Sequence, residues 1–359
     1  MSWLLAFVGF AALIVLHELG HFLAAKAVGM RVERFSLFFG PLVLKRRWGE
    51  TEYGVGVIPL GGYVRITGMD PREELPADVA PRAYYRQAPW RRIVVIAAGP
   101  TMNVLIAFVL LFAIYLGHGK AVATNTVEQI ERGSPAAQVL RLGDRVLAVD
   151  GVRDGPETLR AQLARHTCPG GARKDGCEAA RPAVLTVQRD GRELVVRARP
   201  RWSAQDGRPL LGFAFGARLA GVSAGRAASL SVSRMWILGR DTVGAVVRIF
   251  YSSKARKEVS GVVGSYEVAR ESFEFDTVQA IFVIAVISLS LAIINLFPFV
   301  PLDGGHIFWA LAEKVRGRPI PFEVIERAGA LGFVLIILLF AVGLTNDIGR
   351  LRGEGFGLR

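Results

Sequence analysis

The hydrophobic positions of this chain are gathered into four long stretches in which charged residues are rare, at residues 1–28, 93–116, 277–302 and 328–346. About 20 consecutive apolar residues are enough for a helix to cross the hydrocarbon core of a bilayer. The pattern therefore predicts a polytopic α-helical membrane protein with four transmembrane helices. The first stretch is apolar like a secretory signal peptide. However, it has no basic start and no small-x-small cleavage site, so we expect it to be retained.

Two of the polar segments between these stretches have patterns of β-structure. Segment 29–92 contains the run 54–66, in which glycines alternate with β-formers, and this predicts a β-hairpin-like insert. Such strands beside a catalytic site would either hold an extended substrate by strand addition or form an ordinary turn structure that shields the site. Segment 117–216 alternates strands, a short helix and turns, which predicts an inserted α+β domain.

The remaining polar segments predict helices, a loop and a tail. In segment 217–276, apolar clusters are interrupted by arginines, and we expect amphipathic helices that lie on the membrane surface. A linker helix packed on the preceding domain is the alternative. We expect a loop at 303–327 and a C-terminal tail at 347–359.

Composition and charge support a membrane protein. The chain of 359 residues is 52% hydrophobic, which is too apolar for an ordinary soluble enzyme. Its net charge of +13 would suit nucleic-acid binding or the basic flanks of membrane helices. The second interpretation is favoured, because no nucleic-acid-binding motif is present. Lysines and arginines in 29–92 and 303–327 predict that these loops are cytoplasmic, with the N-terminus outside.

The second half of the first apolar stretch carries the motif His17-Glu18-Leu19-Gly20-His21. Histidines four residues apart lie on one face of a helix, where both imidazoles can bind one Zn²⁺. Glu18 would then lie beside the metal and could take a proton from a water that the metal has made acidic. Polar ionisable residues inside a membrane span are expected to be functional. The sequence therefore predicts a zinc metalloprotease site within the membrane.

A third protein ligand is expected, because a catalytic zinc usually has three. The best candidate is Asp303, in the run 295–306, where two prolines and two glycines would break a helix at membrane depth. A simple turn is the alternative for that run when it is considered alone. The span 93–116 is interrupted by Gly99-Pro100 and carries Asn103, and we expect it to pack against the site.

The chain has two cysteines, Cys168 and Cys177, which do not form a metal-binding pattern. A bond between them would close a small loop. They form a candidate disulfide if the inserted domain faces an oxidising compartment, and two unpaired surface thiols are the alternative.

The inserted domain resembles a PDZ domain of the bacterial, circularly permuted kind. The resemblance rests on Gly133-Ser134-Pro135-Ala136 and Gly143-Asp144-Arg145-Val146, and Leu211-Gly212-Phe213 is similar to the Gly-Leu-Gly-Phe element of such domains. A PDZ-like domain would either bind a peptide tail or restrict access sterically.

The whole chain resembles the site-2 protease family (peptidase M50), and within it the bacterial regulator-of-sigma-E protease type with one PDZ-like domain. The motifs that carry this resemblance occur in the family's order: 17–21, 59–63, 98–103 and 295–306. One departure is Val262, where relatives often have proline after Ser260-Gly261.

The resemblance implies an intramembrane zinc metalloprotease whose zinc ligands are His17, His21 and Asp303 and whose catalytic residue is Glu18. It implies a role for Asn295 in contacting substrate or the reaction intermediate, for which helix packing is the alternative. Pro298, Gly61 and Gly62 are further candidates for substrate binding. The expected location is the bacterial inner membrane.

The resemblance also implies a substrate. It would be a single-pass membrane protein, such as an anti-sigma factor, which a site-1 protease has already trimmed; clearance of remnant signal peptides is the alternative. Two other classes of function compete: a PDZ scaffold with a structural metal site, and a metal transporter. Glu18 argues against the scaffold, and the scarcity of polar residues along the spans argues against the transporter.

Overall fold

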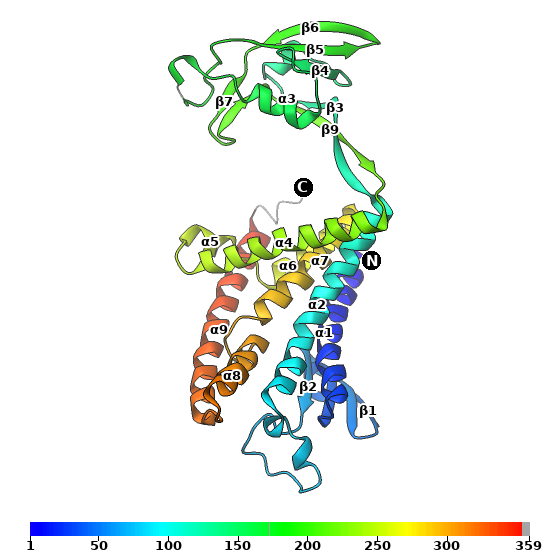
Figure 1. Cartoon of the computed structure of the whole chain (residues 1–359), viewed down its shortest axis with the longest axis vertical. Helices are drawn as coiled ribbons and strands as arrows, with labels where there is room; N and C mark the ends of the chain where they lie inside the picture. The colour runs from blue at the N-terminus through cyan, green and yellow to red at the C-terminus, as the bar shows by residue number, and fades with distance from the viewer. Residues whose placement is uncertain (172, 354–359) are drawn as a thin grey trace. The chain divides into compact units, whose positions relative to one another are not determined.

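The computed structural model describes residues 1–171 and 173–353, which form two compact units. Unit 1 contains residues 1–117 and the described residues from 223 onward, and unit 2 contains residues 118–222. Figure 1 shows the helices of unit 1 and the β-rich fold of unit 2. The sequence of unit 2 is therefore inserted between two helices of unit 1.

Unit 1 is built on long apolar helices that run alongside one another (Figure 1). Four helices in the described residues are long and apolar enough to span a membrane: α1 (Ser2–Ala27), α2 (Pro89–His118), α7 (Thr277–Asn295) and α9 (Phe322–Arg352). The prediction of four spans is confirmed. Helix α7 ends seven residues before the predicted boundary, because Pro298 and Pro301 follow and cannot continue a helix.

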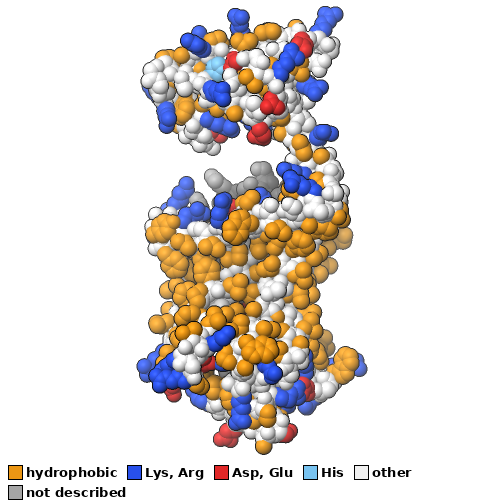
Figure 2. Space-filling view, in the orientation of Figure 1, with side chains coloured by type: hydrophobic (Ala, Val, Ile, Leu, Met, Phe, Trp, Pro, Cys, Tyr) orange, Lys and Arg blue, Asp and Glu red, His pale blue; other side chains and the backbone are white. Residues whose placement is uncertain are grey.

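The outer surface of these helices is apolar. Side chains such as Leu331 and Leu338 are 75% and 58% exposed. The space-filling view of unit 1 shows a band of hydrophobic side chains, with Lys and Arg at both ends of the band (Figure 2). A soluble protein rarely exposes so large an apolar surface. The band therefore fits the hydrocarbon core of a bilayer.

Shorter helices complete unit 1. Helix α4 lies across one end of the long helices (Figure 1), and its exposed apolar residues alternate with arginines, as expected for a surface helix. The segment 303–327, expected as a loop, begins with a helix whose C-terminus is capped by Gly317 in a left-handed conformation. The shorter elements are η1 (Ala80–Arg82), η2 (Tyr84–Arg86), α4 (Ala224–Ile249), α5 (Ser253–Glu258), α6 (Val262–Phe275) and α8 (Asp303–Arg316).

The β-structure of unit 1 consists of β1 (Val32–Trp48) and β2 (Thr51–Ile66), which are antiparallel. Both strands bend back, so residues 32–37 pair with 62–66 on one side and with 52–55 on the other. Residues 44–48 pair in turn with 51–55. The result is a small sheet in which 62–66 forms one outer edge of the described pairing.

A hydrophobic core attaches this sheet to the helices. Buried Ala25 of α1, Val32 of β1, Ile66 of β2, Tyr84 of η2 and Val95 of α2 belong to one cluster. Burying apolar surface of this kind contributes about 25 cal/mol per Å². Because the cluster contains the end of α1 that follows the His17 motif, it fixes the sheet beside that motif.

Unit 2 has a five-stranded sheet with the order β6-β5-β4-β3-β9 and a two-stranded sheet formed by β7 and β8. Helix α3 packs with the larger sheet around a core that includes Leu159, Leu185 and Val187. The predicted β-rich insert is thus present. Its elements are β3 (Lys120–Ile130), η3 (Ala136–Gln138), β4 (Arg145–Val149), α3 (Pro156–Leu163), η4 (Pro169–Gly171), β5 (Ala183–Arg189), β6 (Arg192–Ala198), β7 (Arg201–Ser203), β8 (Arg208–Leu210) and β9 (Phe213–Ala220).

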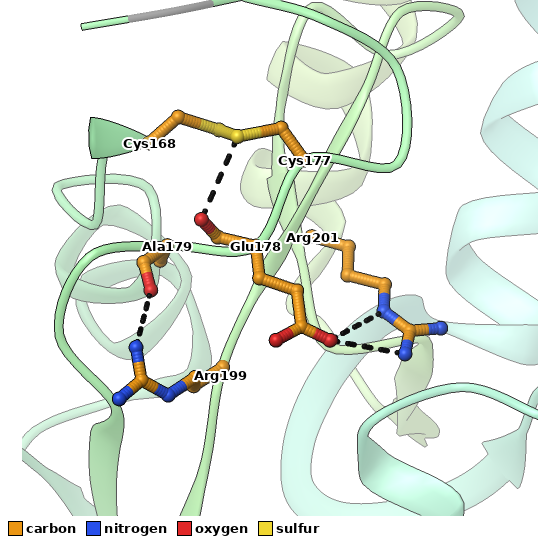
Figure 3. The surroundings of a disulfide bond; sticks show 6 residues. All are labelled: Cys168, Cys177, Glu178, Ala179, Arg199 and Arg201. Atoms are coloured by element: carbon orange, nitrogen blue, oxygen red, sulfur yellow. Dashed lines mark hydrogen bonds and ion pairs between the residues drawn. A yellow bond between two sulfur atoms is a disulfide. The ribbon is translucent and has the colours of Figure 1, made fainter. Parts of the chain in front are cut away.

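Cys168 and Cys177 are joined by a disulfide in the structure (Figure 3). The chain that follows is held by an ion pair between Glu178 and the Arg201 guanidinium at 3.1 Å. The disulfide closes a loop on unit 2, far in sequence from the His17 motif.

A buried ion pair stabilises unit 2. The Asp144 carboxylate accepts hydrogen bonds from the Arg189 guanidinium at 2.7 and 2.8 Å and from the backbone amide of Arg141 at 2.8 Å. The bonds from Arg189 hold the pKa of Asp144 below its usual range. The stabilisation is therefore fully present above about pH 4 and is lost as the pH falls through the lowered pKa.

We predict that Asp144→Asn lowers the free energy of unfolding of unit 2 by about 2 kcal/mol, because it removes charge-assisted hydrogen bonds. Hydrogen exchange of strands β4 and β5 in the full chain measures this as a loss of protection. The variant should also lose the acid dependence described for Asp144. Asp190→Asn, at an exposed neighbouring position, is the control and should leave protection unchanged. Equal protection in Asp144→Asn and wild type would refute the prediction.

Candidate metal centre

Three polar atoms converge between α1 and the start of α8. The Nε2 atoms of His17 and His21 lie 3.3 Å apart, and Asp303 Oδ2 lies 3.2 Å from the first and 3.3 Å from the second. Among the described residues, these three side chains form the group of His, Cys, Asp and Glu close enough together to hold a metal ion. The structure thus brings together the three residues that the sequence predicted as ligands.

The spacing of these atoms fits a tetrahedral metal. Ligand atoms about 2.0 Å from a tetrahedral zinc lie about 3.3 Å from one another. Both histidines are buried, and Asp303 Oδ2 is buried without a hydrogen-bond partner among the described residues. A buried carboxylate oxygen without a partner is costly unless a cation or donor satisfies it. The donor set of two imidazoles and one carboxylate is one that zinc prefers.

The histidines come from α1 because their spacing places them one above the other on a single helix face. Asp303 comes from the first turn of α8, directly after the proline-rich connection from α7. We expected Gly304 and Gly305 to break a helix, but both lie within the first turn of α8. A Cβ on Gly304 would approach Leu296 O to 2.2 Å, and one on Gly305 would approach Val300 N to 2.4 Å. The two glycines therefore let the connection pass close to the helix that carries Asp303.

Glu18 lies next to this cluster. Its carboxylate is close enough to interact electrostatically with His21 and Asp303, and the backbone of Val64 in β2 lies near it. A Cβ on Gly62 would approach Glu18 Cγ to 3.1 Å. The outer strand 62–66 therefore runs directly beside the glutamate.

The other predicted site residues lie at different distances from the cluster. Asn295, the last residue of α7, has its Nδ2 atom 3.5 Å from His17 Nε2. Pro298 is exposed in the connection between α7 and α8. Gly61 lies in β2 against the ring of Phe39, which is 2.9 Å from the position of a Cβ. The side chains of Pro59 and Leu60, in the same motif, lie outside the described ones.

Helix α2 contributes contacts that the sequence motifs did not assign. His21 Nδ1 donates to the backbone carbonyl of Val95 at 2.9 Å, and His17 Nδ1 lies 3.2 Å from Asn103 Nδ2. A Cβ on Gly99 would approach His21 Nε2 to 2.2 Å. Val95, Gly99 and Asn103 are spaced by four residues and so share a helix face. That spacing, together with a lone asparagine in an apolar span, is the sequence signal for these contacts.

We predict that Gly99→Ala disrupts metal binding, because the new methyl group would occupy space that the His21 imidazole fills. The metal affinity of the purified protein should fall by at least about tenfold. Gly117→Ala is the matched control on the same helix, since no heavy atom lies within 4 Å of a Cβ there. Unchanged affinity in Gly99→Ala would show that the helices can separate at no cost to the site.

Comparison with known proteins places the chain in a family. The model of Peptidase family M50 matches residues 5–339. The chain is 33% identical to the zinc metalloprotease Rip1 of Mycobacterium tuberculosis, with 93% of this chain and 94% of the relative covered. It is 31% identical to all3971 of Nostoc sp., a protein named as a zinc metalloprotease. That match covers 94% of this chain and 93% of the relative. The motif, the converging ligand atoms and these matches agree, and the chain belongs to Peptidase family M50.

Proposed function

We propose that this chain is a zinc metalloendopeptidase that hydrolyses a peptide bond in or near the transmembrane segment of a single-pass membrane protein. The observation that carries the proposal is the triangle of His17 Nε2, His21 Nε2 and Asp303 Oδ2 within the apolar helices of unit 1. Family membership and the zinc metalloproteases among the relatives support it.

His17, His21 and Asp303 are the proposed zinc ligands. When bound there, Zn²⁺ would lower the pKa of a water and polarise the scissile carbonyl. The three ligands leave the fourth position of a tetrahedral site for water or substrate, as in catalytic zinc sites.

Glu18 is the proposed general base and acid. Its carboxylate lies beside the ligands but is not one of them, so it is free to take a proton from the attacking water. It would then pass that proton to the leaving amine. The backbone of Val64 and the close contact with Gly62 restrict where the carboxylate can point.

Asn295 is proposed to contact the substrate or the reaction intermediate. It reaches the metal cluster from the end of α7, where its Nδ2 atom lies 3.5 Å from His17 Nε2. An amide N–H can donate to the oxygen on which negative charge develops during acyl transfer. Pro298 prevents α7 from continuing, which leaves a non-helical connection where a substrate strand could approach.

The outer strand 62–66 is proposed to hold the substrate in an extended form. A helical substrate shields its carbonyls, so it must unwind before cleavage. A groove of about 510 Å³ follows this strand, lined by residues 63–66, Met69 and Glu73 among others. An unpaired strand edge can add a peptide strand through backbone hydrogen bonds. Gly61 and Gly62 let Phe39 and Glu18 pack directly against this strand, so the carboxylate would stay close to the added backbone.

Unit 2 is proposed to be a PDZ-like domain. Its outer strand β9 and helix α3 flank a groove of about 560 Å³, lined by Arg160, Phe213 and Ala214 among others. An outer strand beside a helix is the arrangement by which PDZ domains bind peptide tails. The domain would select or exclude substrates by this groove.

We propose that the protein lies in the bacterial inner membrane, with the N-terminus and unit 2 in the periplasm and the active site towards the cytoplasm. Arg91 and Arg92 lie at the start of α2, shortly before Val95, whose carbonyl contacts His21, and basic residues at this end support a cytoplasmic side. The disulfide between Cys168 and Cys177 fits an oxidising periplasm.

The proposed substrate is an anti-sigma factor or a similar single-pass protein that a site-1 protease has trimmed, as in regulated intramembrane proteolysis. Clearance of remnant signal peptides would use the same chemistry. A PDZ scaffold with a structural metal is disfavoured, because Glu18 lies against the site without serving as a ligand.

We predict that Glu18→Gln retains zinc and loses cleavage by at least about 10³-fold, because it removes the proton acceptor. His17→Ala should lose both zinc and cleavage. Both are measured on purified protein in detergent, with a single-span model substrate and a zinc chelator as control. Cleavage near the wild-type rate in Glu18→Gln would sink the proposed role, and normal zinc content in His17→Ala would refute ligation.

We predict that substrate cross-links to the outer strand. With Glu18→Gln as a trap, Arg65→Cys should form a disulfide with a cysteine near the scissile bond of the substrate. Arg65 lines the groove and its side chain is 54% exposed. Arg46→Cys, on the strand at the far edge of the sheet, is the control. Equal cross-linking at both positions would remove the support for strand addition.

A further inference from the structure

Metal binding by the two histidines requires a particular tautomer of each ring. A neutral imidazole carries one hydrogen, and the nitrogen that binds the metal must be the other one. Since both Nε2 atoms face Asp303, both rings must carry their hydrogen on Nδ1. The groups that face the two Nδ1 atoms therefore decide whether the rings can bind a metal.

For His21 the structure settles the tautomer. Its Nδ1 lies 2.9 Å from the backbone carbonyl oxygen of Val95, which can only accept a hydrogen bond. The hydrogen is therefore on Nδ1, and Nε2 is free for the metal.

For His17 the facing group is the side-chain amide of Asn103, which can donate or accept. The structure places Asn103 Nδ2 3.2 Å from His17 Nδ1, while Asn103 Oδ1 is buried without a partner among the described residues. In this orientation the amide would donate to Nδ1. The hydrogen of the ring would then be on Nε2, the position that faces Asp303 and His21.

The tautomer conflict disappears when the amide is turned over, because its oxygen then accepts from His17 Nδ1–H and leaves Nε2 for the metal. The oxygen and nitrogen of an asparagine amide have nearly the same shape, so their assignment rests on hydrogen bonding. We infer that Asn103 is a positioning residue that presents its side-chain oxygen to His17 Nδ1 and so fixes the metal-binding tautomer. The inference rests on the proposed zinc site and adds a residue of α2 to it.

The surroundings of Asn103 suit this role. The residue is completely buried, and its backbone carbonyl accepts a hydrogen bond from the Ser288 hydroxyl of α7 at 2.9 Å. It follows Gly99 by one helical turn, so the close contact of Gly99 with His21 sets the distance between α1 and α2 at this point. Partners of this kind that orient a metal-binding imidazole typically change metal affinity by 10–100-fold.

The test compares a side chain that can only accept a hydrogen bond with one that can neither donate nor accept. Zinc affinity of the metal-free full chain in detergent is measured by competition with a chromophoric chelator, and folding is checked by circular dichroism. Asn103→Leu should bind zinc about 10–100-fold more weakly than wild type. Asn103→Asp, whose carboxylate can only accept, should stay within about threefold of wild type or bind more tightly. The Co²⁺ absorption spectrum of Asn103→Asp should keep its tetrahedral intensity.

Ser288→Ala is the matched control. It removes the buried hydrogen bond between α7 and the Asn103 backbone but leaves the amide in place, so zinc affinity should not change.

Three outcomes would overturn the inference. Unchanged affinity in Asn103→Leu would show that His17 needs no partner. An equal loss in Asn103→Asp would show that the accepting oxygen is not what matters, and this outcome is readable even if Asn103→Leu does not fold. Failure of wild type to bind zinc would overturn the proposed metal site and this role with it, whereas the first two outcomes leave the metal site intact.

Discussion

The structure of unit 1 depends on the meeting of one carboxylate oxygen with two imidazole nitrogens among apolar helices. Asp303 Oδ2 lies within 3.3 Å of both histidine Nε2 atoms, and it is buried without another partner among the described residues. In a medium of low polarity such a group is stable only beside a cation or a donor. The packing of the helices must therefore fix the position of α1 relative to α8, since a small displacement would leave the carboxylate unsatisfied.

Glycines at the contacts between these segments allow the close packing that fixes this position. Gly99 lets α2 contact the His21 ring, and Gly304 and Gly305 let the connection after α7 pass against the start of α8. Membrane helices have no hydrophobic force that drives them together, so close packing at small residues takes its place. The same approach of α2 brings the Val95 carbonyl and the Asn103 amide to the outer nitrogens of the two histidines. One packing contact thus sets both the position and the orientation of the cluster.

The β-structure of unit 1 and the whole of unit 2 are held by hydrophobic cores. The outer strand 62–66 is attached to the end of α1 by the core around Ile66 and Tyr84, which keeps a strand edge next to Glu18. Unit 2 has its own core and its own buried ion pair, and neither includes a residue of the metal cluster. The metal cluster and the β-rich domain therefore belong to two different compact units of one chain.

The sequence by itself determined the four apolar helices, the β-rich insert and the His17 motif, because hydrophobic runs and a four-residue spacing are local properties. It also pointed to Asp303, since prolines and glycines next to a carboxylate are unusual at the end of a span. Only the tertiary structure decided which α2 atoms face the imidazoles, that residues 62–66 form an outer edge, and that Gly304 and Gly305 begin a helix. The first two features arise from contacts between segments up to 86 residues apart, and no local pattern specifies how such segments are rotated against one another.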